Sequence, residues 1–184
     1  MYRKVLFFLV LSNFLVSQNT SDIYNTGLNC FLNEDYLCAK KYFAKIIINQ
    51  DKYYSSFDEY AHYYYYVSSL RLYNKDAQDL FYEFVETFPL SNKKDDAVFL
   101  MSEYLFEKKE YKQVVDLLSE INLYQLSIDR KNAAFFYLGY SCYVIEKYDL
   151  AKSSFYELTI AFNNPFREDA IFYNSQILLE EANF

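Results

Sequence analysis

Residues 139–155 read GYSCYVIEKYDLAKSSF, and residues 27–43 read GLNCFLNEDYLCAKKYF. In both segments an alanine follows the opening glycine by 12 residues, and a phenylalanine follows that alanine by 4. The two segments lie 112 residues apart, which corresponds to three units of about 37 residues. Self-similarity at a fixed period of roughly 20 to 50 residues is the signature of a repeat architecture.

The units between and beyond these segments keep part of the pattern. In the second unit Ala77 and Phe81 repeat the alanine–phenylalanine pair, but Tyr65 stands where the small residue belongs. In the third unit Ser102 is the small residue, and valine and leucine replace the alanine and the aromatic. A fifth unit, present only in part, has Ser175 at the small position. We therefore expect about four and a half repeats of roughly 36 to 38 residues each.

The composition favours helices throughout the chain. Its 184 residues include 2 Gly and 2 Pro, against 22 Tyr and 18 Phe. A many-stranded sheet needs turn residues at every corner, and a phosphate-binding loop needs clustered glycines, so both are excluded. The single histidine, His62, argues against a histidine-based metal site and against a Ser-His-Asp triad. The sequence therefore predicts an all-α protein.

The repeats resemble those of the tetratricopeptide repeat family. The resemblance rests on Leu138-Gly139, on the small residue and the aromatic that recur in the units, and on Pro89 and Pro165, which each close a unit. It covers the chain from about residue 21 onward. It implies a right-handed superhelical solenoid of antiparallel helix pairs, in which each unit buries its apolar face against the next.

The resemblance also implies a binding groove. In this family the first helix of each unit lines a concave surface, through the positions three before, one after and four after the small residue. Aromatic side chains at such positions suit the binding of an extended peptide or a partner helix. Because neighbouring units also pack through these positions, a role in the core remains an open alternative. The candidate groove residues are Tyr24, Phe31, His62, Tyr66, Phe99, Glu103, Phe106, Phe136, Tyr140, Tyr143 and Phe172.

The first residues of the chain have the layout of a secretory signal peptide. Arg3 and Lys4 precede an apolar run from Val5 to Val16, and Ser17 then precedes a polar run. The alternative is a first amphipathic helix of the core. The apolar run is shorter than the ~20 residues that span a bilayer, so we expect no transmembrane segment in the mature chain.

Removal of the signal peptide, residues 1–17, would leave residues 18–184 as the repeat domain, which could continue in a longer protein. These residues have 16 basic and 25 acidic side chains, a net charge of −9. An acidic chain without a basic stripe is a poor nucleic-acid binder, because phosphate contacts dominate that affinity. The leader and the Tyr- and Phe-rich repeats together look like large periplasmic repeat proteins of Gram-negative bacteria. We therefore expect a periplasmic location, with outer-membrane association left open.

Three cysteines would meet an oxidising compartment after secretion. Because three is an odd number, at least one cysteine stays free or pairs between chains. Their spacing fits no metal-binding pattern, and a free cysteine commonly behaves as a small buried hydrophobe. We expect that role most clearly for Cys142 and less clearly for Cys30 and Cys38.

No constellation of residues predicts catalysis, so we expect neither an enzyme nor a cofactor. The first hypothesis is a non-enzymatic scaffold or adaptor of the cell envelope that captures a protein or peptide partner in its aromatic groove. The second is an accessory or carbohydrate-binding domain, since tyrosine-rich surfaces stack on sugars.

A last helix from about Arg167 to Ala182 would expose Ile171 and Leu178, which predicts self-association through the C-terminal end of the chain.

Overall fold

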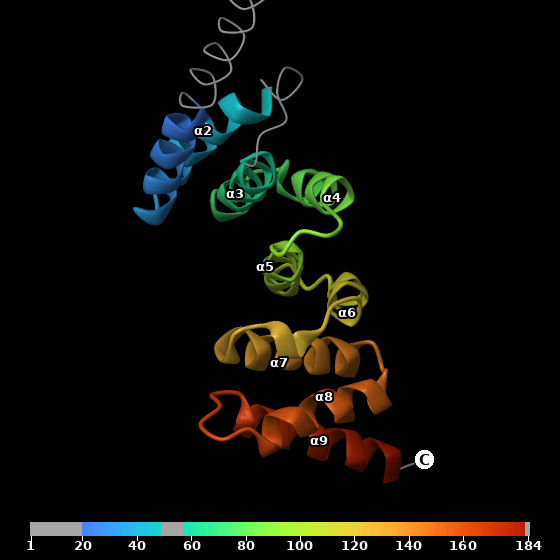
Figure 1. Cartoon of the computed structure of the whole chain (residues 1–184). Helices are drawn as coiled ribbons and strands as arrows, with labels where there is room; N and C mark the ends of the chain where they lie inside the picture. Colours follow the sequence, from blue (N-terminus) through green and yellow to red (C-terminus); the bar gives the residue numbers. More distant parts are fainter. Residues whose placement is uncertain (1–19, 49–56, 183–184) are drawn as a thin grey trace, which may run out of the picture. The chain divides into compact units, whose positions relative to one another are not determined.

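The computed structural model describes residues 20–48 and 57–182 (Figure 1). The described residues contain helices and turns and no β-strand, which confirms the all-α prediction. Within them no helix is both long enough and apolar enough to cross a membrane. The expected signal peptide, residues 1–17, lies outside the described residues.

The chain divides into two compact units, and their boundary in the sequence lies between Lys93 and Lys94. Unit 1 contains a helix over residues 20–32, followed by α2 (Tyr36–Ile48), α3 (Asp58–Arg71) and α4 (Ala77–Thr87). Unit 2 contains α5 (Lys94–Glu107), α6 (Tyr111–Ser119), the 3-10 helix η2 (Leu123–Gln125), α7 (Ile128–Val144), α8 (Tyr148–Ile160) and α9 (Arg167–Ala182).

Within each unit, helices that follow one another in sequence pack against one another. In unit 1 α3 packs against both α2 and α4. In unit 2 each helix from α5 to α9 packs against the next one in sequence. In addition, α5 contacts α7, and α7 contacts α9. This ladder of neighbours is the packing that short connections between antiparallel helices produce.

Four turns with the same backbone geometry join the two helices of successive pairs. In each turn one non-glycine residue has a positive φ, between 53° and 63°, and these residues are Glu34, Tyr73, Lys109 and Glu146. Each donates its N–H to the carbonyl three residues before it, and the next residue donates to the carbonyl five residues before itself. This pair of bonds is the Schellman motif that ends many helices. The turns recur at intervals of 39, 36 and 37 residues, which gives the sequence repeat a structural counterpart.

The small residues of the repeat mark close contacts between paired helices. A Cβ atom added to Gly139 would lie 2.8 Å from Cε1 of Phe155 in α8. A Cβ atom added to Gly27 would lie 3.2 Å from Cε1 of Phe43 in α2. In both pairs, therefore, the phenylalanine ring occupies the space that a side chain on the first helix would need.

The structure corrects the alignment of the second unit. The small residue lies seven positions before the positive-φ residue in the first, third and fourth units, at Gly27, Ser102 and Gly139. Counted back from Tyr73, the same position is Tyr66, and the assignment to Tyr65 was wrong by one residue. The cause is one residue fewer in the connection: Ala77 follows its positive-φ residue by four positions, whereas Ala39, Val114 and Ala151 follow theirs by five.

With this register, one contact between successive repeats recurs along the chain. In this contact, the residue two positions before the small residue packs against a residue of the preceding repeat. That partner lies four positions after the small residue of its own repeat. The ring centroids are 4.8 Å apart for Tyr64 and Phe31, 4.5 Å for Tyr137 and Phe106, and 5.3 Å for Tyr173 and Tyr143. Aromatic pairs at such separations contribute beyond the apolar area that they bury.

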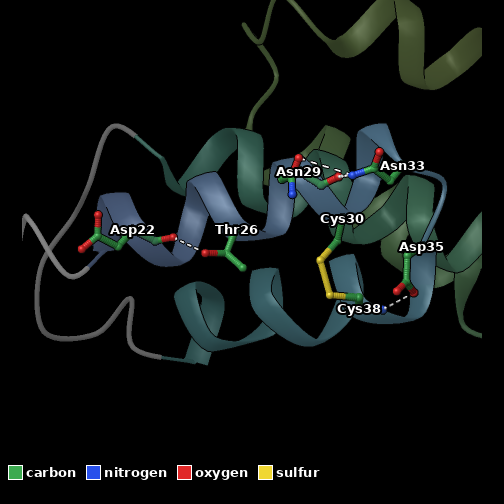
Figure 2. The surroundings of a disulfide bond; sticks show 7 residues. All are labelled: Asp22, Thr26, Asn29, Cys30, Asn33, Asp35 and Cys38. Atoms are coloured by element: carbon green, nitrogen blue, oxygen red, sulfur yellow. Dashed lines mark hydrogen bonds between the residues drawn. A yellow bond between two sulfur atoms is a disulfide. The ribbon is translucent and has the colours of Figure 1, made fainter.

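A disulfide joins Cys30, near the end of the first described helix, to Cys38 in the first turn of α2 (Figure 2). Their Cα atoms are 5.7 Å apart, within the usual range for a disulfide. Between them Asp35 caps α2, because its carboxylate accepts a hydrogen bond from the backbone N–H of Cys38. The expectation of buried free thiols was therefore wrong for this pair. It is confirmed for Cys142, which is free and buried, and burial raises its pKa to about 11.

Candidate functional site

The candidate groove residues fall into three classes of exposure. Tyr66, Phe99 and His62 are buried, with 0%, 4% and 8% of their surface exposed, so in this structure they serve as core residues. At the other extreme, 56% of the surface of Phe172 is exposed. The remaining candidates are half-buried, namely Tyr24, Phe31, Glu103, Phe106, Phe136, Tyr140 and Tyr143.

In unit 1 the half-buried candidates pack mainly against their own unit. The ring of Tyr24 stacks on Phe57 at 4.7 Å and meets Phe43 edge-on at 5.8 Å. Burial and the neighbouring tyrosines Tyr64 and Tyr60 raise the pKa of Tyr24 to about 12. Its ring thus contributes to the aromatic core of this unit more than to its surface.

The environment of His62 is that of a structural histidine. Its ring lies 5.3 Å from the ring of Phe88, and its Nδ1 lies 3.8 Å from a carboxylate oxygen of Glu83. Burial lowers the pKa of His62, although Glu83 and Asp58 oppose the shift. At neutral pH the imidazole is therefore neutral, and its neighbours are those of a packed side chain.

Unit 2 carries a continuous array of half-buried rings, which we call the tyrosine face. Its aromatic members come from α5, α7 and α9, from the first turns of α6 and α8, and from the loop before α9. Its charged members are Glu103 and Glu180. Its aromatic residues are Phe106, Tyr111, Phe136, Tyr137, Tyr140, Tyr143, Tyr148, Phe166 and Tyr173.

Tyr140 lies at the centre of the tyrosine face. Its ring centroid is 5.5 Å from that of Phe106, 5.7 Å from that of Tyr111 and 5.0 Å from that of Tyr173. Phe136, one turn before Tyr140 in α7, stacks on Phe166 at 4.8 Å. Because each ring contacts its neighbours, the array holds its half-buried rings in fixed positions.

Carboxylates hold the phenol groups at both ends of the array. Tyr137 donates a hydrogen bond to Glu103 at 3.4 Å, and Tyr143 donates one to Glu180 at 3.3 Å. Burial, together with Glu103 and Glu107, raises the pKa of Tyr137 to about 12. A hydrogen bond to Glu180, together with burial, raises the pKa of Tyr148 to about 12. At neutral pH Tyr137 and Tyr148 are therefore uncharged, and Glu103 and Glu180 are the acidic side chains that accept the hydrogen bonds.

Three basic side chains of unit 2 have partners outside this array. Arg130 forms an ion pair with Asp96, and Lys152 bridges Asp149 and Glu181. Lys108 lies over the ring of Tyr104, 5.2 Å from its centroid. The tyrosine face therefore combines aromatic surface with negative charge.

Sequence reasoning identified five of the aromatic and charged members and missed the others. Tyr137 and Tyr173 occupy the column two before the small residue, which the family resemblance does not assign to a groove. Their signal was present in the sequence, because Tyr137 and Tyr173 lie 36 residues apart, one repeat. Tyr111 and Tyr148 are the first residues of α6 and α8, whereas the family resemblance assigns the groove to the first helix of each unit.

Among the described residues no group of three or more His, Cys, Asp or Glu side chains is placed to hold a metal ion. Comparisons of the chain with protein-family models, with curated proteins and with solved structures find no match. The tyrosine face therefore has to be interpreted from its own chemistry.

Proposed function

We propose that this protein is a non-enzymatic binding scaffold that captures a partner polypeptide on its tyrosine face. The observation that carries the proposal is the array itself, in which nine half-buried rings from five helices and one loop form a supported surface with Glu103 and Glu180. Tyrosine is enriched in binding surfaces because a large, rigid, amphipathic ring provides contact area at low conformational-entropy cost.

The tetratricopeptide-like architecture belongs to this proposal. Four equivalent turns, the glycine–phenylalanine contacts and the recurring contact between successive repeats support a solenoid of antiparallel helix pairs. A solenoid presents the same helix of each repeat along one side, and an extended segment can lie across several repeats. On this view α5, α7 and α9 are the first helices of successive repeats, and the tyrosine face is their common surface.

The chemistry of the face indicates how a partner would be held. Rings such as Tyr140 and Phe136 lose water when a partner side chain packs on them, and this desolvation supplies most of the affinity. Glu103 and Glu180 attract positive charge and orient the bound segment. We therefore expect the contacting segment to combine apolar side chains with Lys or Arg.

A location in the cell envelope completes the proposal. The Cys30–Cys38 disulfide is of the kind that persists in oxidising compartments and is rare in the cytosol of mesophilic organisms. Together with the signal-peptide layout of residues 1–17, it supports export across the inner membrane, with the mature chain in the periplasm.

The proposal is tested by selecting peptides from a displayed random library on the purified protein. The wild type should enrich a sequence family, and the Phe136→Ala/Tyr140→Ala variant should bind its best member at least about 30-fold more weakly, since an anchor contributes ~2 kcal/mol. The matched control is Tyr156→Ala, because Tyr156 is an exposed tyrosine of α8 outside the array. Circular dichroism would verify that all variants remain folded.

Two outcomes would contradict peptide capture on this face. Enrichment that is equal for the wild type and the double variant would place binding elsewhere. A glycan array that responds to the wild type, fails with the double variant, and accompanies a silent peptide selection would favour the second hypothesis of a carbohydrate-binding domain.

A further inference from the structure

At one end of the tyrosine face, tyrosines from three successive helices gather beside one carboxylate. Tyr143 lies near the end of α7, Tyr148 begins α8, and Tyr173 belongs to α9. The ring centroid of Tyr143 is 6.3 Å from that of Tyr148 and 5.3 Å from that of Tyr173, with the planes tilted by 39° and 47°. All three side chains are half-buried, so part of each is open to solvent. We call these three rings, together with Glu180, the Glu180 site.

Glu180 accepts hydrogen bonds from two of these phenols. The hydroxyl of Tyr143 is 3.3 Å from its Oε1, and Tyr148 is the second donor. Glu180 follows Tyr173 by seven residues, or about two helical turns, so both lie on the same side of α9. A carboxylate has about four lone-pair positions, and the two phenols occupy two of them. The carboxylate can therefore accept further N–H donors.

The Glu180 site has further acidic neighbours. Glu146 interacts electrostatically with Tyr148, and Asp169 interacts in the same way with Tyr173. Lys152, the basic residue of α8, forms its ion pairs with acidic side chains outside the site. Positive charge is therefore attracted to this end of the tyrosine face.

A guanidinium group suits this combination of rings and carboxylate. It is flat, stacks on aromatic rings, and donates two parallel N–H groups to a carboxylate. It is also more weakly hydrated than an ammonium group, so it loses less when it enters a half-buried site. The ammonium group of lysine is a compact, strongly hydrated charge, and a quaternary ammonium group has no N–H to donate.

The hydrogen bonds to Glu180 also prepare the rings for a cation. A phenol that donates to a carboxylate is polarised by it, which leaves more electron density on the ring and strengthens the attraction of a cation above the ring. The hydrogen bond to Glu180, together with burial, raises the pKa of Tyr148 to about 12. At neutral pH this phenol therefore stays protonated and keeps the carboxylate in place.

We propose that the Glu180 site binds an arginine side chain of the captured polypeptide. The inference rests on the proposed capture of a polypeptide by the tyrosine face, and it assigns a residue type to one end of that face. The guanidinium group stacks on the tyrosine rings and donates its N–H groups to Glu180, while apolar side chains of the same segment pack on Phe136 and Tyr140.

Nuclear magnetic resonance of the full chain, with carbon-13 in its tyrosine rings, tests the site with a small probe. The probe is N-acetylarginine methylamide, and single Tyr→Phe substitutions assign the ring signals. We expect a saturable shift of the signals of Tyr143, Tyr148 and Tyr173. N-acetyllysine methylamide should bind at least about threefold more weakly, and the uncharged citrulline analogue at least about tenfold more weakly.

Substitution of the carboxylate tests its role. Glu180→Gln should weaken binding of the arginine probe at least about tenfold, because a charge-assisted hydrogen bond is lost. The matched control is Glu157→Gln, which should leave the affinity unchanged. Glu157 of α8 likewise accepts a hydrogen bond from a tyrosine, Tyr124 of η2, but both residues lie outside the tyrosine face. Circular dichroism would verify that both variants remain folded.

Three results would overturn the proposal. The arginine probe may cause no saturable shift at these rings, or Glu180→Gln may bind it as tightly as the wild type does. Tetramethylammonium that binds as tightly as the arginine probe would show a general cation site instead.

These results are distinguishable from a failure of polypeptide capture. Selected peptides that need Phe136 and Tyr140 but are insensitive to Glu180→Gln would keep the scaffold and remove the arginine site. A saturable arginine probe beside a silent peptide selection would do the reverse.

Discussion

Replacement of Gly139 by leucine should destabilise unit 2, because Phe155 already occupies the space beside the glycine. The new Cβ atom would lie 2.8 Å from Cε1, 2.9 Å from Cδ1 and 3.2 Å from Cζ of that ring. Ordinary carbon–carbon contacts are ~3.5–4.0 Å, and three further carbons of the leucine follow the Cβ. The Phe155 ring is fully buried and also stacks on Tyr173, so it has no free space into which to move.

The expected loss of stability follows from two opposing effects. Overpacking of a close helix–helix contact costs typically ~1–3 kcal/mol and sometimes more. Removal of a glycine from a helix interior recovers about 1 kcal/mol of helix propensity. With the ring confined as it is, we expect a net loss of about 2–3 kcal/mol, which should lower the melting temperature by about 5–10 °C in a chain of this size.

Thermal and urea unfolding followed by circular dichroism would measure this loss. Phe155→Leu makes room beside the glycine, so it should be less harmful in the Gly139→Leu background than in the wild type. The double-mutant cycle should therefore report a coupling energy of about 1 kcal/mol or more between the two positions. The reasoning is refuted if Gly139→Leu melts within about a degree of the wild type, or if the two substitutions prove additive.

Three further predictions concern other parts of the chain. Phe99→Ala should cost ~3–5 kcal/mol of stability because Phe99 is a buried core side chain, whereas Phe136→Ala should cost markedly less in the same unfolding assay. Cys30→Ser and Cys38→Ser should each lose about 2 kcal/mol and should melt like the reduced wild type; an unchanged melting temperature with reductant would contradict the disulfide. The pKa of Tyr137 is about 12 in the folded chain against 10.0 ordinarily, so the folded state holds this proton more tightly. The stabilisation is complete below pH ~10 and is lost as the pH rises through about 12, which urea unfolding beside tyrosinate absorbance would detect.

The sequence predicted the features that depend on local spacing. The all-α class and the last helix from Arg167 to Ala182 agree with the structure. Spacing determines these features because a helix repeats its faces every 3.6 residues. The same spacing predicted that Ile171 and Leu178 would be exposed.

The sequence failed where one loop changed the register. Because one residue fewer separates Tyr73 from Ala77, the small position of the second unit moves to Tyr66, whose buried ring packs 5.7 Å from that of Phe81. A repeat with a tyrosine in place of a glycine offers no small residue from which to count. In the structure, the positive φ of Tyr73 marks the register of this repeat instead. The sequence does not reveal this marker, because the positive-φ residues of the other three turns are Glu and Lys and share no residue type with Tyr73.

The candidate site was predicted only in part, for a related reason. The groove positions that the family resemblance assigns depend only on where a residue lies on its own helix. The exposure of its side chain also depends on which side chains of the next repeat pack against it. Phe99 and Phe136 occupy the same column, yet Phe99 is buried and Phe136 is half-exposed. The tyrosine face becomes visible only when the contacts between repeats are known, because Tyr137 and Tyr173 join it through rings of the preceding repeat.

Photo-cross-linking inside the cells that make this protein tests the central claim most directly. A benzophenone side chain would replace Tyr140 at the centre of the tyrosine face, and in a matched control it would replace Tyr156, an exposed tyrosine of α8 outside the array. The account predicts that irradiation joins position 140 to one discrete polypeptide, identified by mass spectrometry, and that the adduct is lost with Phe136→Ala. Position 156 should yield no such adduct. Equal adducts at both positions, or no polypeptide adduct at position 140, would contradict capture of a partner on this face.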